Sequence, residues 1–192
     1  MAASFYARPA ETVARELLGT VILSTIGGDL VAARIVETEA YVGSEDEASH
    51  AAARIGRTPR NEAMFGPAGI AYVYLIYGVH WCLNAVATEP GHPAAVLIRA
   101  ASVLQGLQVT RRRRGRVPAE ALLRGPGNLC RALGVTGLMN AHRLSEAPLC
   151  FLPGPSVSDA EVVRGPRVGI TRSVDLPLRF CIRGDPAVSR RQ

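Results

Sequence analysis

Residues 20–42 read TVILSTIGGDLVAARIVETEAYV, and residues 70–87 read IAYVYLIYGVHWCLNAVA. Each stretch is a run of apolar and β-branched residues that a glycine turn signal interrupts once, a pattern that predicts a β-hairpin. Gly27-Gly28-Asp29 divides the first stretch and Tyr77-Gly78 divides the second. The two stretches therefore predict a curved, mainly antiparallel β-sheet from which the second hairpin protrudes.

The rest of the chain supplies shorter elements. A proline, apolar residues at helical spacing and a closing glycine predict a helix within 9–19 and another over 126–133. We also expect a strand over 94–103, a basic loop over 111–116, a helix over 118–124 and short strands over 149–152, 168–171 and 178–182. Because no linker or repeat divides the chain, the prediction is a single α+β domain spanning residues 1–192, with short helices flanking the sheet.

Composition argues against several classes of protein. With 48% hydrophobic and 20% charged residues, the chain should form a packed globule and not a disordered segment. No apolar run approaches the ~20 residues of a membrane helix, and the first residues lack a secretory signal. We therefore expect a cytoplasmic protein, associated with the nucleoid if its partner is DNA.

Cysteine and histidine spacing gives no sign of a metal site. The four cysteines lie far apart without a C-x-x-C pair, and the four histidines lack H-x-x-x-H or H-E-x-x-H spacing. We expect reduced and mostly buried thiols, no metal and no cofactor.

Charge is spread unevenly along the chain. Residues 1–96 hold 6 Arg against 10 acidic residues, a balance of −4, whereas residues 97–192 hold 16 Arg against 6, a balance of +10. All 22 basic residues are arginine. A net charge of +6 with clustered arginine is typical of proteins that bind polyanions, although a GC-rich genome would also favour arginine.

Alternation along 31–42 places Glu37, Glu39 and Tyr41 on one face of the predicted strand, because successive strand side chains face opposite ways. A solvent-exposed strand face would show the same residues without any function. The residues farther along the chain favour a site. Arg99 is a lone guanidinium in the apolar run AAVLIRAA, and a buried arginine normally pairs with a carboxylate, for which Glu37 and Glu39 are the candidates. An edge-strand arginine reaching solvent is the alternative.

Aromatic residues mark the second hairpin. Tyr72 and Tyr74 share a face, where they either form a stacking surface or pack as core. Tyr77 precedes Gly78 and should project from the hairpin tip, which would suit a side chain that inserts between base pairs. Asn84, on the return strand, needs a hydrogen-bond partner or solvent.

Seven segments, taken together, resemble the alkyladenine (3-methyladenine) DNA glycosylase family, as a bacterial member. They are ETEAYVG (37–43), EDEASH (45–50), TPRNEAMF (58–65), AYVYLIYG (71–78), VLIRA (96–100), GPGNLCRALG (125–134) and PLRFCIRG (177–184). The resemblance runs in order from about residue 14 to residue 189, and its most specific parts are the block around Glu39 and the tyrosine hairpin.

The resemblance implies a role for each matching residue. Glu39 matches the general base that activates the attacking water, and Arg99 matches the arginine that helps to hold that water. The other matches are to base-binding residues, namely Tyr41 and Tyr74 as aromatic walls, His50 as a hydrogen-bonding contact and Asn84 as the amide that disfavours guanine. Tyr77 matches the residue that enters the duplex. The implied partner is double-stranded DNA containing a damaged purine, and the implied state is a monomer.

The chain also departs from the family. Asn128 stands where many members have lysine, and we expect the loop between His50 and Thr58, which carries Arg54 and Arg57, to differ in length from the family's. We expect Arg57, Arg60, Arg111 and Arg112 to contact phosphates, with a solvated basic surface as the alternative.

Without lysine, the chain lacks the usual amine for a Schiff base with the sugar, and Met1 supplies the only candidate amino group. The prediction is a monofunctional enzyme that leaves an abasic site. Two other functions stay open. A non-catalytic binder of damaged DNA would not need Glu39, and a nucleosidase acting on free nucleosides would not need Tyr77.

Overall fold

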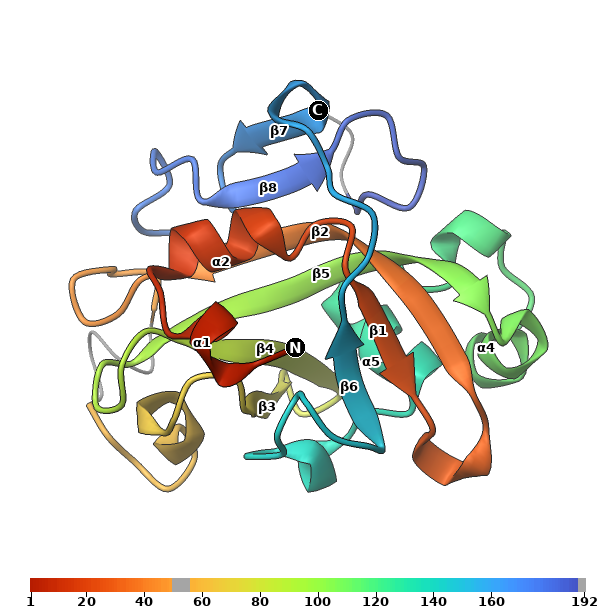
Figure 1. The fold of residues 1–192 in the computed structure, drawn as a ribbon, viewed down its shortest axis with the longest axis horizontal. Coiled ribbons are helices and arrows are strands. Elements are labelled where there is room, and N and C mark those ends of the chain that lie inside the picture. Colours follow the sequence, from red (N-terminus) through yellow and green to blue (C-terminus); the bar gives the residue numbers. More distant parts are fainter. Residues whose placement is uncertain (50–55, 190–192) are drawn as a thin grey trace.

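A computed structural model describes residues 1–49 and 56–189 of the chain (Figure 1). Its strands are β1 (Val21–Ser24), β2 (Val31–Tyr41), β3 (Ala71–Ile76), β4 (His80–Ala87), β5 (Ala94–Gln105), β6 (Leu149–Leu152), β7 (Val162–Gly165) and β8 (Arg179–Ile182). Its α-helices are α1 (Ala3–Tyr6), α2 (Ala10–Glu16), α4 (Leu107–Arg114) and α5 (Pro126–Leu133). Short 3-10 turns cover Ile26–Gly28, Glu62–Phe65, Ala119–Ala121, Gly137–Met139 and Asp159–Glu161.

All pairings between the named strands are antiparallel, in the order β3-β4-β5-β2-β1-β6. The long strand β2 pairs with β5 along one edge, while its other edge is shared by β1 at its start and by β8 at Glu37–Glu39. β7 then pairs with β8. This curved antiparallel sheet with short flanking helices confirms the predicted α+β class (Figure 1).

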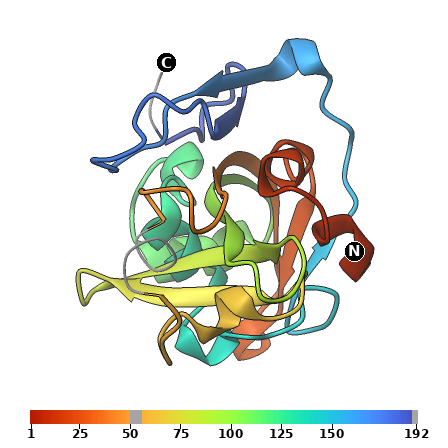
Figure 2. The same cartoon turned by 90° about the vertical axis from the view of Figure 1, so that its left-hand side faces the viewer.

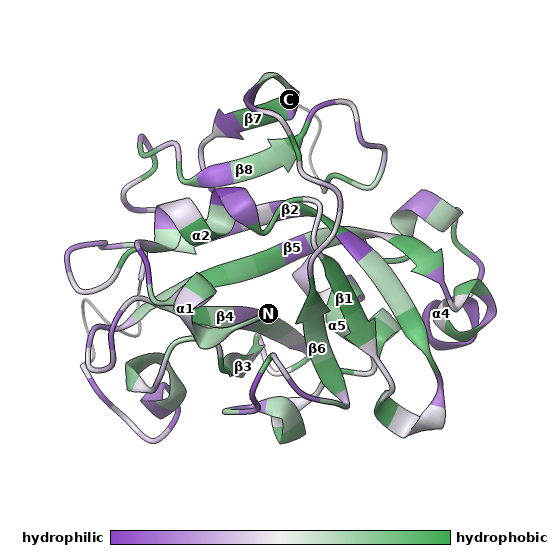
Figure 3. Ribbon diagram, in the orientation of Figure 1, coloured by the Kyte–Doolittle hydropathy of each residue, from purple (hydrophilic) through white to green (hydrophobic). Residues whose placement is uncertain are grey.

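The core lies between the sheet and the helices, because the strands and helices bury their apolar side chains together. Its largest fully buried side chains include Tyr6, Leu17, Ile35, Leu133 and Phe151. The central strands are mostly hydrophobic in Figure 3, whereas α4 is hydrophilic. No helix among the described residues is long and apolar enough to cross a membrane.

The second hairpin, β3–β4, extends beyond the body of the molecule, as Figure 2 shows at its left. Tyr77 (φ 53°) and Gly78 (φ 70°) form its turn, and the Val79 N–H donates to the Ile76 carbonyl at 3.2 Å. Tyr77 is 83% exposed. The predicted placement of Tyr77 at an exposed hairpin tip is therefore confirmed.

Three of the predicted elements are wrong. The arginine run at 111–114 is the end of helix α4 and not a loop, because arginine is a good helix former and Gly115 (φ 85°) stops the helix only after Arg114. The expected helix over 118–124 is reduced to the single 3-10 turn at Ala119–Ala121. The expected strand over 168–171 is absent, and 162–165 forms β7 in its place.

Candidate active site

Glu39 lies near the end of β2, next to β5 and β8, and its carboxylate is fully buried. Three donors reach the carboxylate. The Val168 backbone N–H donates to Oε1 at 2.7 Å, while the Tyr41 hydroxyl at 3.1 Å and Arg99 Nη1 at 3.4 Å donate to Oε2. The carboxylate is thus fixed in orientation by neighbours from three separate parts of the chain.

Burial raises the pKa of Glu39 above its ordinary value, because removal from water disfavours the charged form. The Arg99 charge, the Val168 N–H and the Tyr41 hydroxyl oppose that shift. The net direction is upward, which brings Glu39 closer to the range in which a carboxylate accepts protons effectively near neutral pH.

Arg99 on β5 joins Glu39 to a second buried carboxylate, Glu37. Arg99 Nε donates to Glu37 Oε1 at 3.2 Å, so the arginine pairs with both of the carboxylates that the sequence offered as alternatives. Glu37 also accepts from Arg179 Nε at 2.7 Å and from the Ser189 backbone N–H at 2.6 Å. The described end of the chain is thereby attached to the network that orients Arg99.

The tyrosines lie next to this network. Tyr41 is half-buried, and Tyr74 is close enough for its charge to raise the pKa of Tyr41 further, after the larger effects of burial and of Glu39. Tyr72 is 4% exposed and stacks on Tyr74, with ring centroids 5.2 Å apart and an angle of 28° between the rings. Tyr72 is therefore a core residue that supports Tyr74, which itself is half-buried.

Arg167 and Asp46 form a buried ion pair behind Tyr41 that sequence reasoning missed. Arg167 Nη2 donates to Asp46 Oδ1 at 2.8 Å, and Nη1 bonds both to Asp46 Oδ2 and to the Ala40 carbonyl. The Arg167 guanidinium carbon lies 4.8 Å from the centre of the Tyr41 ring. Burial alone would raise the pKa of Asp46, but Arg167 lowers it below its ordinary value.

Asn84 is 4% exposed, and its side-chain amide donates to the Tyr72 carbonyl at 3.0 Å. Asn84 and Tyr72 are opposite each other in the β3–β4 ladder, so the amide lies on the strand face that also carries Tyr74. His50, the other expected base contact, lies outside the described residues.

The four arginines expected at phosphates are all exposed, but they differ in their partners. Arg57 pairs with Glu62, Arg112 pairs with Asp29, and Arg60 donates to the Leu75 carbonyl at 2.6 Å. Arg111 contacts no acidic group within the described part of the chain. Their role at phosphates stays a prediction.

The remaining arginines of α4 have structural contacts. Arg113 Nη2 donates to the Ile26 carbonyl at 2.7 Å and its Nη1 to the Ala132 carbonyl at 3.1 Å, while Arg114 donates to Leu122 at 2.9 Å. These two side chains tie the helix to its surroundings.

Within the described ranges, no group of three or more His, Cys, Asp and Glu residues could hold a metal ion.

A buried carboxylate beside half-buried tyrosines, with one exposed aromatic on a projecting hairpin, suits an enzyme that acts on a base outside the duplex stack. The sequence profile of the Methylpurine-DNA glycosylase (MPG) family matches residues 4–186. The chain therefore belongs to the methylpurine-DNA glycosylase family and is a DNA N-glycosylase, a hydrolase of N-glycosyl bonds that serves DNA repair.

Similar proteins from other bacteria carry names that are consistent with this family. A protein of Myxococcus xanthus is 47% identical over 190 residues, covering 97% of this chain and 92% of its own length. One from Anaeromyxobacter dehalogenans is 48% identical over 97% of this chain and 84% of its own. One from Nitrosospira multiformis is 45% identical over 93% and 88%, respectively. All three are named "Putative 3-methyladenine DNA glycosylase".

Proposed function

We propose that this glycosylase flips alkylated or deaminated purines out of duplex DNA and removes them by hydrolysis, leaving an abasic site. The substrates we propose are 3-methyladenine, 7-methylguanine, hypoxanthine and ethenoadenine. The observation that carries the proposal is the buried Glu39 carboxylate, which accepts hydrogen bonds from Arg99, Tyr41 and the Val168 N–H. The stacked rings of Tyr72 and Tyr74 lie next to it.

Base flipping costs a few kcal/mol of lost stacking and pairing. Stacking on an aromatic ring returns ~1–3 kcal/mol per base, which Tyr41 and Tyr74 would supply on either side of the flipped purine. Tyr77 would fill the gap in the duplex, since it is the exposed aromatic at the tip of the projecting hairpin.

Glu39 would act as the general base in the hydrolytic step. The carboxylate takes a proton from water, the water oxygen bonds to C1′ of the sugar, and the C1′–N bond breaks with its electron pair leaving on the purine. Negative charge on Glu39 also stabilises the positive charge that develops on the sugar. Assistance of this kind typically contributes ~10²–10⁴ in rate.

Arg99 would help to hold the water near Glu39, because its guanidinium is fixed by two carboxylates. Asn84 would contact the base on the face that carries Tyr74 and disfavour guanine, and His50 would supply a further hydrogen bond to the base. We expect the enzyme to act as a monomer on double-stranded DNA.

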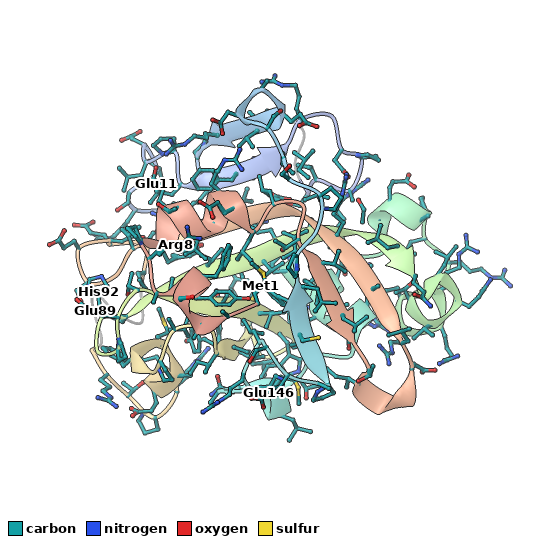
Figure 4. All side chains as sticks on the ribbon, in the orientation of Figure 1. Met1, Arg8, Glu11, Glu89, His92 and Glu146 are labelled. Atoms are coloured by element: carbon teal, nitrogen blue, oxygen red, sulfur yellow. The ribbon has the colours of Figure 1, made fainter. Side chains whose placement is uncertain are left out.

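The position of the amino group of Met1 supports a monofunctional enzyme. That amine donates to the Phe151 carbonyl at 2.8 Å. Figures 1 and 4 view the molecule from the side on which Met1 lies, and Figure 2 shows the N-terminus on the side opposite the hairpin tip. An amine held there is badly placed to form a Schiff base with a sugar bound near the hairpin.

The test is base release from a duplex carrying one hypoxanthine, compared with the free nucleoside inosine. Our proposal expects release from the duplex, an abasic product and no covalent adduct after borohydride. Release from inosine alone would support a nucleosidase, and tight lesion binding without release would support a non-catalytic binder. A borohydride-trapped adduct would contradict the monofunctional mechanism.

A further inference from the structure

The segment that follows β7 contacts two parts of the site, although it lies more than 120 residues away from them in the sequence. The Arg167 side chain covers Tyr41, and the backbone N–H of the next residue, Val168, bonds to Glu39. The proposed stacking wall and the proposed general base are therefore held by adjacent residues.

Arg167 contacts one face of the Tyr41 ring. Its guanidinium is planar and has no exposed side-chain surface, and its centre lies 4.8 Å from the ring centroid. A face covered in this way cannot stack on a base. The opposite face of Tyr41 is the only one left for a purine.

Asp46 fixes the guanidinium in this position. Both carboxylate oxygens accept from Arg167, and Oδ1 also accepts from the Ala48 N–H at 3.1 Å. Arg167 Nη1 in turn bonds to the carbonyl of Ala40, the residue between Glu39 and Tyr41. The ion pair thus restrains the backbone as well as the ring.

Stability alone gives a weak reason for this arrangement. A buried ion pair costs desolvation that its attraction often only offsets, and well-packed neutral replacements of such pairs are often no less stable. A pair that touches both the ring and the backbone of the site has a positional effect that does not depend on its net contribution to folding.

We propose that Arg167, fixed by Asp46, is a positioning residue that sets the orientation of Tyr41 for stacking on the flipped purine. This inference rests on the proposed function, because it assigns Tyr41 to the base. It predicts that removing the pair impairs capture of the base more than it impairs folding.

The experiment compares Asp46→Asn/Arg167→Met, which removes both charges together, with Arg113→Met as a matched control. Arg113 also donates to two backbone carbonyls and lies near one carboxylate, that of Asp29, but it is on α4, and in the described part of the chain none of these partners belongs to the site. Single-turnover release of hypoxanthine is measured at saturating enzyme, together with unfolding in urea. We expect the double variant to release the base about tenfold more slowly, the scale of one lost aromatic–cation contact, with the control within about twofold of wild type.

A second readout follows base capture without cleavage. In a Glu39→Gln background, a duplex with one ethenoadenine reports stacking of the flipped base by the quenching of its fluorescence. We expect weaker quenching in the double variant than in the control, and an intermediate result for Arg167→Lys, which keeps the charge but loses the planar fork.

The inference would be overturned if the double variant released hypoxanthine at the wild-type rate and, in the Glu39→Gln background, quenched ethenoadenine as strongly as Glu39→Gln alone. The same is true if Arg167→Lys, folded as in wild type, matches wild type in both. Absence of base release by wild type would instead overturn the proposed function, and the fluorescence comparison would still decide the role of Arg167.

Discussion

Glu39 combines two properties that a surface carboxylate lacks, because it is removed from water and it has three fixed donors. Burial raises its pKa while Arg99 and the other donors limit the rise. A carboxylate of this kind is ionised over a narrower range of pH than an exposed glutamate, and that difference can be measured.

We predict that base release rises as pH rises through the pKa of Glu39, because only the ionised carboxylate accepts a proton. Since that pKa is raised, the midpoint of the acid limb should lie above the ~4.3 of an ordinary glutamate. Single-turnover release of hypoxanthine across pH, corrected for release without enzyme, measures it. Circular dichroism at each pH provides the control for folding. A midpoint at or below ~4.3 in folded protein would contradict the assignment.

Glu37 should matter for stability. It is fully buried and accepts from Arg99, Arg179 and Ser189, so Glu37→Gln removes the charge that compensates these donors. We predict a loss of about 3–5 kcal/mol in the free energy of unfolding, measured in urea. The matched control is Glu47→Gln, whose exposed pair with Arg172 should contribute about 0–1 kcal/mol. Equal losses in the two variants would show that the Glu37 network is not structural.

The site residues that can be predicted from the sequence are those that differ in character from their neighbours along the chain. Arg99 could be assigned to a carboxylate because it stood alone in an apolar strand, and the structure confirms that pairing. Arg167 gave no such sign, because its partner Asp46 lies in an acidic run 121 residues away. Contacts at that separation depend on how the segment after β7 folds back over β2.

At the scale of elements, the hairpin β3–β4 places one aromatic side chain far from the core. Tyr77 has a positive φ of 53°, a conformation that is uncommon for a bulky non-glycine residue and strained. With 83% of its surface exposed, it gains little from packing in the free protein. A strained and exposed tyrosine at a tip is more consistent with binding than with folding.

We predict that Tyr77→Ala slows base release from duplex DNA but not from single-stranded DNA, because only the duplex needs a side chain to fill the gap. The free energy of unfolding should change by no more than about 0.5 kcal/mol. The control is Leu104→Ala, which removes an exposed apolar side chain on β5. If Tyr77→Ala slows release equally from both substrates, insertion into the duplex is not its role.

Elements with a strong local pattern were predicted well. Apolar and β-branched runs on either side of a glycine turn predict β2, β3 and β4, although β2 is buried on both faces and shows no alternation of burial. Helix α5 begins at Pro126 and ends before Gly134, as expected. The predictions for 111–116 and 168–171 are wrong because hydrogen bonds to distant residues, which a local sequence pattern does not show, help to decide the structure there. Helix α4 has an arginine-rich end, and Arg113 and Arg114 bond to carbonyls elsewhere in the chain. Residues 168–171 have the sequence pattern of a strand, but the Val168 N–H donates to the Glu39 carboxylate and not to a neighbouring strand.

At the scale of the whole molecule, the net charge of +6 should make DNA binding depend steeply on salt, because each phosphate contact releases counterions. We predict that Arg111→Gln lowers the slope of log affinity against log salt by about one, since Arg111 is exposed and pairs with no acid in the described ranges. Arg15→Gln is the control, because Arg15 already bonds to Asp159 and to the Val157 carbonyl. Equal slopes for wild type and Arg111→Gln would remove Arg111 from the DNA contact.

In the mechanism that we propose, Glu39 is the base of a hydrolytic DNA glycosylase. The most direct measurement is single-turnover release of hypoxanthine from a duplex by wild type and by Glu39→Gln, with lesion binding measured for both proteins. We predict equal binding by the two proteins and a rate of release that falls by at least ~10² in the variant. Release by Glu39→Gln at the wild-type rate would contradict it, and the carboxylate would then have to be assigned to structure alone.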